Sequence, residues 1–269
     1  MAFSVYGNSG ATQAYNALLT TTNSTQKAQL QLASGKRINS AADDTSGFRV
    51  SSELMTKISL MKSASSNVDS GKNLLSTAES ALTSVNDLLT QIAGKVSASS
   101  DPTADLTSLS NDINSLGNEI SSIMTNTQFN STALLSGSTV PSGANFVFKT
   151  GTTESTTINF GTLSTLNLAS ISGTGATASN ITSIDISGLQ TAVQNALGSI
   201  GNFTQRLNVK SDYLTSAMTN AQSTVDSLQG TDTAKEQLAS TQGQIASQIS
   251  TSMLSQLNSA PQQLLKLFQ

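Results

Sequence analysis

Cysteine, histidine and tryptophan are absent from this chain of 269 residues. Zinc sites built on Cys or His, thiol nucleophiles and His-based triads are therefore excluded. The isolated glycines form no phosphate-binding loop, so we expect neither an enzyme nor a cofactor. Charge is also scarce, with 13 Lys and Arg against 16 Asp and Glu. So few basic residues supply no stripe for nucleic acid, which is not an expected partner.

Long apolar runs are missing as well, and none approaches the roughly 18 residues that span a bilayer, so a membrane is not an expected partner. Residues 1–7 have neither a basic region nor an apolar core, and no cleavable secretory signal is expected. Hydrophobic residues make up 36% of the chain and its net charge is −3. These values favour an ordered chain whose copies repel one another little.

Residues 50–93 carry two apolar seams at alternating steps of four and three. This 3.5-residue repeat keeps one face of a helix turned toward a partner helix. A helix of that length is about 65 Å long, at 1.5 Å per residue, so it needs other long helices to cover its seams. The seams consist of Leu54, Met61, Val68, Leu75, Leu82 and Leu89, and of Lys57, Ala64, Gly71, Ala78, Val85 and Ile92.

A second long heptad region, residues 189–228, supplies the missing partner. A single polar residue interrupts a seam in each long helix, Lys57 in the first and Lys210 in the second. Such a residue more often fixes the register of a coiled coil than carries chemistry. The seams of this region are Leu189, Ala196, Phe203, Lys210 and Ala217, and Val193, Ile200, Leu207, Leu214, Ala221 and Leu228.

Shorter helices are predicted on either side. Residues 11–34 have a sparse seam that needs tertiary packing, and the helix after residue 232 carries an apolar tail that needs burial, so we expect these two to pair. Gly94 and residues 97–100 are expected to break the first long helix. Asp101 and Pro102 are expected to begin a third helix, as its N-cap and first residue.

Residues 131–187 change in character, because Gly, Ser and Thr dominate and alternation replaces the heptad. Phe146 and Phe148, then Ile158, alternate on either side of Thr150–Glu154, which can turn a hairpin. Further short extended pieces are expected at Leu163, Leu166, Leu168 and Ile171. The predicted fold is therefore mostly α: a long antiparallel coiled-coil-like bundle with a small insert containing a β-hairpin.

Three stretches of the chain resemble bacterial flagellin. Residues 32–47, LASGKRINSAADDTSG, are similar to the family signature of a Leu-x-Ser-Gly-x-Arg-Ile-Asn run followed by Ala, Asp-Asp and Gly. Residues 118–130 are similar to the end of the family's third helix, and residues 256–265, QLNSAPQQLL, to its C-terminal ending.

The resemblance implies an extracellular subunit that self-assembles into the flagellar filament for swimming motility. It implies export without cleavage through the flagellar type III apparatus, an export chaperone and a filament cap. Residues 1–45 and 231–269 would form the two halves of an inner filament-core domain. Residues 46–230 would form an outer rod, with the β-rich insert at about 131–187.

Site residues follow from the same resemblance. The signature and assembly turn comprises Ser34, Gly35, Arg37, Ile38, Asn39, Asp43, Asp44 and Gly47. The candidate subunit-contact stretch comprises Leu89, Gln91, Ile92 and Lys95. Inner-core helix packing is assigned to Leu18, Leu32, Ile245, Ile249, Leu257, Leu264 and Leu265. Asp43 and Asp44, adjacent in a turn, are expected to cap helices or bond the loop rather than catalyse.

One departure from the family concerns an Arg-x-Arg-Glu-Leu motif that contacts neighbouring subunits and is recognised by Toll-like receptor 5. Gln91, Ala93 and Gly94 stand here in place of Arg, Arg and Glu. Because alanine cannot make the bidentate contacts of an arginine, weak or absent receptor recognition is expected.

Two alternatives to a filament subunit fit the sequence: a hook–filament junction protein with similar helical ends, and a secreted helical effector.

Overall fold

A computed structural model gives the structure of residues 9–135, 145–151, 153–159 and 171–267. It confirms a mostly helical chain with a small hairpin insert. The helices are α1 (Ser9–Ser34), α2 (Thr45–Ala98), α3 (Leu106–Asn126), a short 3-10 helix (Ile181–Ser183), α4 (Ile186–Gln229) and α5 (Thr233–Leu267). The strands are β1 (Gln128–Phe129), β2 (Thr132–Ala133), β3 (Asn145–Lys149) and β4 (Ser155–Asn159), which form two antiparallel pairs, β1–β2 and β3–β4.

The chain divides into two compact units. The first contains residues 1–56 and 220–269, and the second contains residues 57–219. The first unit therefore joins the two ends of the chain. The inner filament-core domain (residues 1–45 and 231–269) and the outer rod (residues 46–230), both inferred from the resemblance, stay predictions.

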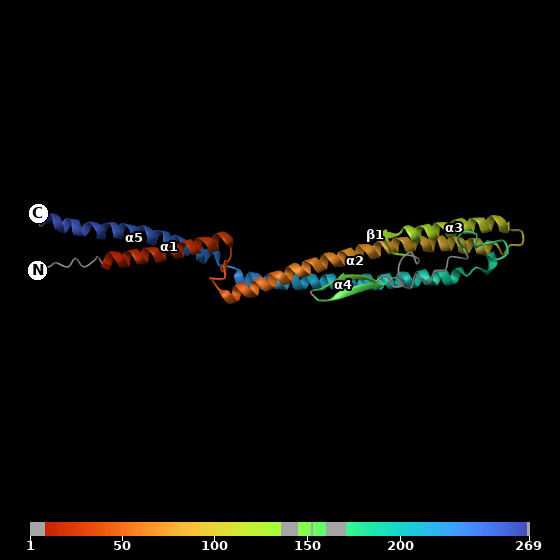
Figure 1. Ribbon diagram of the computed structural model, residues 1–269, viewed down its shortest axis with the longest axis horizontal. Coiled ribbons are helices and arrows are strands. Elements are labelled where there is room, and N and C mark those ends of the chain that lie inside the picture. The colour runs from red at the N-terminus through yellow and green to blue at the C-terminus, as the bar shows by residue number, and fades with distance from the viewer. Residues whose placement is uncertain (1–8, 136–144, 152, 160–170, 268–269) are drawn as a thin grey trace. The chain divides into compact units, whose positions relative to one another are not determined.

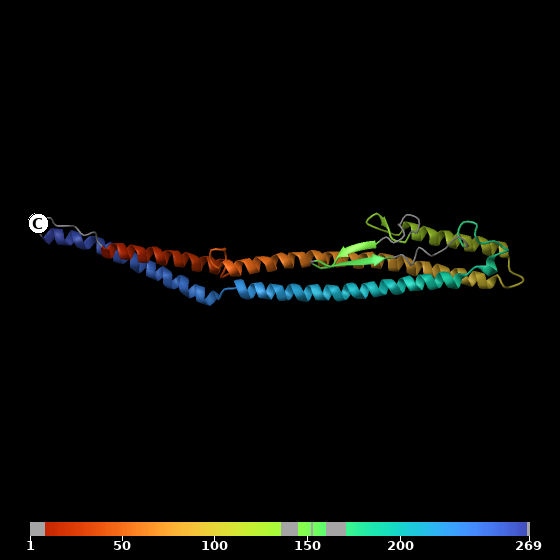
Figure 2. The same ribbon diagram turned by 60° about the horizontal axis from the view of Figure 1, so that its bottom comes forward.

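The second unit is organised by the seams of α2. From residue 61 to residue 92 every seam position is buried, as the heptad predicted. α4 runs alongside α2 within this unit (Figures 1 and 2) and turns its own seam residues Val193, Ile200, Leu207 and Leu214 into the same core. The two long helices are therefore partners. Lys57, the polar seam position of α2, is exposed.

Gly71 explains one gap in the seam. A Cβ added there would lie 3.1 Å from Leu207 Cδ1 and 3.6 Å from a ring carbon of Phe148. The missing side chain thus lets α4 and strand β3 approach α2 at one point. Figure 2 shows the β3–β4 hairpin lying against the two long helices.

The hairpin turns where the alternation predicted. Phe146 pairs with Ile158 and Phe148 with Thr156, and the Thr150 N–H donates to the Glu154 carbonyl over 3.0 Å. Lys210, the polar seam residue of α4, forms an ion pair with Glu154 and lies over the Tyr213 ring, 5.2 Å from its centroid. This lysine thus ties the hairpin to α4.

α3 holds the loop that precedes α4. The Asn114 side chain donates to the Ala176 carbonyl over 2.8 Å and accepts from the Ala176 N–H over 2.9 Å. Asn118 accepts from the Gly173 N–H over 2.7 Å. Gly117 lies between these two asparagines, and a Cβ on it would clash with the Ile171 carbonyl. α3 and this loop are therefore in backbone contact.

Three sequence expectations for this unit are wrong. Gly94 does not interrupt the first long helix, because an exposed glycine costs only about 1 kcal/mol relative to alanine. The helix ends at Ala98, within the other predicted break at residues 97–100. α3 begins at Leu106 rather than after Asp101. Its N-cap is Asp105, which accepts from the Thr107 and Ser108 N–H groups, while Asp101 accepts from the Thr103 N–H in the preceding turn. Ile171 lies in a turn rather than in an extended piece.

The predicted extended pieces at Leu163, Leu166 and Leu168 lie outside the described residues.

The first unit pairs α1 with α5, which confirms the predicted pairing of the N- and C-terminal helices (Figure 1). Small and polar side chains fill the contact: Thr25, Ala28 and Ser240 are each at most 8% exposed. A Cβ on Gly243 would clash with the Thr25 hydroxyl. Within the part of the chain that the structure describes, no helix is long and apolar enough to cross a membrane.

Two glycine-to-alanine substitutions test the packing of α3. Gly117→Ala improves helix propensity but drives a methyl group into the Ile171 carbonyl, so we expect a loss of about 1–3 kcal/mol of unfolding free energy. Gly94→Ala is the matched control, because nothing lies within 4 Å of its Cβ position, and it should gain about 0.5–1 kcal/mol. Thermal unfolding followed by circular dichroism measures both. Equal gains in the two variants would contradict the backbone contact.

Candidate functional site

The signature residues gather in one place. All eight lie in the connection between α1 and α2 or in the helix ends that flank it, from Ser34, the last residue of α1, to Gly47 in the first turn of α2. This connection is called the signature turn below. It belongs entirely to the first unit.

Gly35 ends α1 in the left-handed region, with a φ of +67°, a conformation that glycine adopts without strain. The Ser34 hydroxyl accepts from the Lys36 N–H over 3.1 Å. The Gln31 side chain, 9% exposed, then donates to the Arg37 carbonyl over 2.7 Å. Local hydrogen bonds therefore fold the chain back immediately after the helix.

Asp43 organises the middle of the signature turn. Its carboxylate pairs with the Lys27 ammonium at 2.8 Å and accepts from the N–H groups of Asn39 and Ser40 over 3.2 and 3.1 Å. The Lys27 contact, followed by these turn donors, lowers the pKa of Asp43 from 3.8 to about 2. The carboxylate thus binds α1 to the turn.

Asp44 and Gly47 form the start of α2. Asp44 directly precedes the helix, and its Oδ1 accepts from the Gly47 N–H over 2.9 Å, which is the bond that an N-cap carboxylate makes. A Cβ on Gly47 would lie 2.6 Å from Ile38 Cδ1 and 2.7 Å from Asp44 Oδ2. Since Ile38 is only 1% exposed, glycine is required here so that this isoleucine can be buried.

Arg37 joins the signature turn to the end of α4. Its N–H donates to the Gln229 carbonyl over 2.5 Å and its guanidinium donates to the Leu228 carbonyl over 3.0 Å. The Thr231 N–H returns a bond of 3.3 Å to the Gly35 carbonyl. The two connections of the first unit, one from each end of the chain, are thus tied by backbone hydrogen bonds.

Gln229 and Ser51 belong to this arrangement and were missed by sequence reasoning. The Gln229 side chain, 6% exposed, donates to the Ser51 hydroxyl over 2.6 Å across 178 positions of sequence. A glutamine beside a glycine indicates only a helix break, and a serine in a Ser-rich helix has no distinguishing signal. Only the tertiary structure brings them together.

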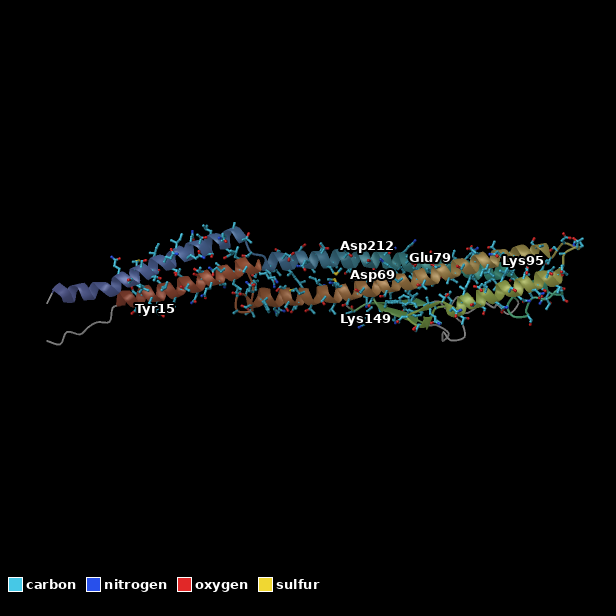
Figure 3. The ribbon with its side chains drawn as sticks, turned by 90° about the horizontal axis from the view of Figure 1, so that it is seen from above. Tyr15, Asp69, Glu79, Lys95, Lys149 and Asp212 are labelled. Carbon is cyan, nitrogen blue, oxygen red and sulfur yellow. The ribbon has the colours of Figure 1, made fainter. Side chains whose placement is uncertain are left out.

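The candidate subunit-contact stretch divides into two kinds of residue. Leu89 and Ile92 are fully buried, so their side chains pack inside the chain's own second unit. Gln91 is exposed, and Lys95 forms an ion pair of 2.6 Å with Asp112 of α3 (Figure 3 labels Lys95). Of the four residues, only Gln91 and Lys95 therefore remain predicted contacts with neighbouring subunits.

The residues assigned to inner-core packing also differ among themselves. Leu18 and Leu32 are predicted contacts on α1, and both are half-buried, whereas Ile245 and Ile249 of α5 are 53% and 55% exposed. Packing of α5 on α1 within one chain therefore does not use the two isoleucines. Their place in an inner core formed by several chains stays a prediction. The side chains of Leu257, Leu264 and Leu265 lie outside the described residues.

The two adjacent carboxylates of the signature turn shape the backbone. Asp43 and Asp44 are occupied by hydrogen bonds that shape the turn. Across the described ranges, no group of three or more acidic residues is placed to hold a metal ion. The arrangement is suited to holding helices in fixed register.

Comparison with known proteins gives the family. The family model of the bacterial flagellin N-terminal helical region matches residues 5–139, and that of the C-terminal helical region matches residues 183–268. The flagellin of Halalkalibacterium halodurans is 31% identical over 91% of this chain and 92% of its own. The flagellin of Bacillus subtilis is 27% identical over 97% of this chain and 98% of its own. Together with the signature turn and the paired terminal helices, these matches show that the chain belongs to the bacterial flagellin family, the structural subunits of flagellar filaments.

Proposed function

We propose that the chain builds a swimming filament by packing the outward face of its first unit against other copies of itself. The observation that supports this is an apolar stripe on α5. Leu238, Ile245, Ile249 and Met253 are 53–59% exposed, and steps of seven, four and four residues place them on one face of the helix.

The same unit exposes large side chains on α1. Tyr15, labelled in Figure 3, is 53% exposed, Leu19 is 44% exposed and Leu30 is 56% exposed. Small and polar residues are buried between the two helices while large apolar ones face outward. A soluble monomer rarely leaves so many apolar side chains together in water. This inverted distribution suits a unit whose core is completed by neighbours.

Further parts of the proposal come from family resemblance. The chain is exported through the flagellar type III apparatus with the help of an export chaperone, and it is added to the filament beneath a cap. Recognition by Toll-like receptor 5 is weak, because Gln91 and Ala93 cannot form the contacts of the two arginines in the family motif.

The two alternatives have less support. A hook–filament junction protein shares helical ends, but the relatives reported above that align along nearly their full lengths are flagellins. A secreted effector that inserts into membranes needs a long apolar hairpin, whereas β3–β4 has two strands of five residues each.

Assembly tests the apolar stripe directly. Ile245→Ser and Ile249→Ser should each raise the critical concentration for filament growth from seeds by about tenfold, since each loses roughly 1.4 kcal/mol of burial at an interface. The melting temperature of the monomer should stay near that of the wild type because both side chains are already exposed. Sedimentation of filaments measures the first quantity and circular dichroism the second. Gln237→Ser, at an exposed polar position of α5 that lies off the stripe, is the control.

If wild-type protein forms no filaments from seeds in a precipitant, the proposed function is wrong. If it does form them and the isoleucine variants assemble like the control, the stripe is not the interface.

The signature turn predicts a pH dependence of stability. The folded pKa of Asp43, about 2, lies below its ordinary value of 3.8, so its ionised form favours the folded state. This contribution is complete above about pH 5 and is lost as the pH falls toward 2. Asp43→Asn should therefore lower the melting temperature of the first unit at pH 6, and its difference from wild type should shrink between pH 5 and pH 2. Asp212→Asn, at an exposed position of α4, is the control. A difference that stays constant down to pH 2 would assign the effect to something other than the charge of Asp43.

A further inference from the structure

A pocket of about 310 Å³ opens beside the signature turn. Its walls come from three segments of the first unit: residues 34–36 after α1, Met55 of α2, and the last turns of α4 with Asp226 and Gln229. None of the roles assigned above uses this pocket.

Gln229 leaves a hydrogen-bond acceptor without a donor in the pocket wall. Its side chain is 6% exposed, and its Oε1 has no hydrogen-bond partner. The Gln229 Nε2 donates to the Ser51 hydroxyl over 2.6 Å, and this hydroxyl donates to the Phe48 carbonyl over 2.9 Å. A buried acceptor left unpaired costs about 1–3 kcal/mol, so a donor that reached Oε1 would be bound favourably.

Asp226 adds a negative charge one helical turn away. Its Oδ1 accepts from the Gln222 amide over 2.8 Å. None of the five ion pairs formed among the described residues includes this carboxylate. An unpaired amide oxygen and an unneutralised carboxylate on one wall together favour a positively charged N–H donor.

We propose that this pocket receives a lysine or arginine side chain from a second copy of the chain. The proposal rests on the proposed function, which supplies the second copy. Gly230 in the pocket wall lies three positions before α5, the helix that carries the apolar stripe. In the filament, this cation donates the hydrogen bond to Gln229 Oε1 that the single chain lacks.

Lys36 is the rival occupant, because it lines the same pocket. Its ammonium could turn inward and neutralise Asp226 within one chain. The two occupants are distinguished by removing each partner in turn.

The test compares wild-type protein with three full-length variants, Gln229→Met, Asp226→Asn and Lys36→Ala, and with Asp212→Asn as the control. Critical concentration for seeded growth is measured at low and high salt, together with the melting temperature of the monomer. We expect Gln229→Met and Asp226→Asn to raise the critical concentration about tenfold at low salt, with a smaller effect of Asp226→Asn in high salt. The monomer melting temperature of Asp226→Asn should stay close to wild type, whereas Gln229→Met loses the buried bond from Nε2 to the Ser51 hydroxyl and should melt slightly lower. Lys36→Ala and Asp212→Asn should assemble as wild type does.

Carbodiimide cross-linking of filaments made from mixed light and heavy isotope protein identifies the donor. A light–heavy link from Asp226 names a lysine of the second copy. No such link, together with the raised critical concentration, assigns an arginine.

Three outcomes would overturn the inference alone, with the wild type still forming filaments. Variants of Asp226 and Gln229 that assemble normally would show that the pocket is not used. A loss in Lys36→Ala equal to that in Asp226→Asn would give the pocket to the chain's own lysine. A fall in monomer melting temperature that accounts for the whole change would make Gln229 a structural residue only. Absence of wild-type filaments would instead overturn the proposed function, and this inference with it.

Discussion

The buried seam of α2 is the constraint on which the second unit depends. A stripe repeated every 3.5 residues stays on one face only when a second helix of similar length lies beside it, and α4 meets that condition with its own buried seam. The remaining elements attach to this pair: the hairpin through Phe148 at Gly71 and the Glu154–Lys210 ion pair, and α3 through the Lys95–Asp112 ion pair. Since helix propensity alone stabilises helices weakly in water, the length of α2 is a consequence of this packing.

The contact between α1 and α5 buries different residues from the core of the second unit, and this difference supports the functional argument. Leu and Ile fill the core of the second unit, which is therefore complete in one chain. Between α1 and α5 the buried positions include Thr25, Ala28 and Ser240, with Gly243 in close contact. Such small contacts remove little apolar surface from water. Under the proposed function, the larger burial of apolar surface occurs when the outward isoleucines of α5 meet another copy of the chain.

Periodicity predicted the seams, the partner helices and the hairpin because each depends on residues close in sequence or on a repeated spacing. It failed where two local signals compete. Asp101 before Pro102 has the composition of a helix start, yet its carboxylate caps a turn and Asp105 caps α3. The signature was found by resemblance, although residue type predicted that Asp43 and Asp44 would cap a helix or bond the loop, as they do. The tie from Arg37 to Gln229 was not predictable, since backbone donors and acceptors are present at nearly every position and only the fold selects which of them meet.

The signature turn shows why a structural subunit can depend strictly on residues that perform no chemistry. Gly35 is needed for its left-handed backbone, and Gly47 because Ile38 and Asp44 occupy the space of a side chain. Each glycine fixes the direction of the chain between two helices. A change in that direction at the turn displaces the far end of the following helix by a distance that increases with the helix length. A repeating filament copies that displacement at every interface, because each subunit presents the same surfaces to its neighbours.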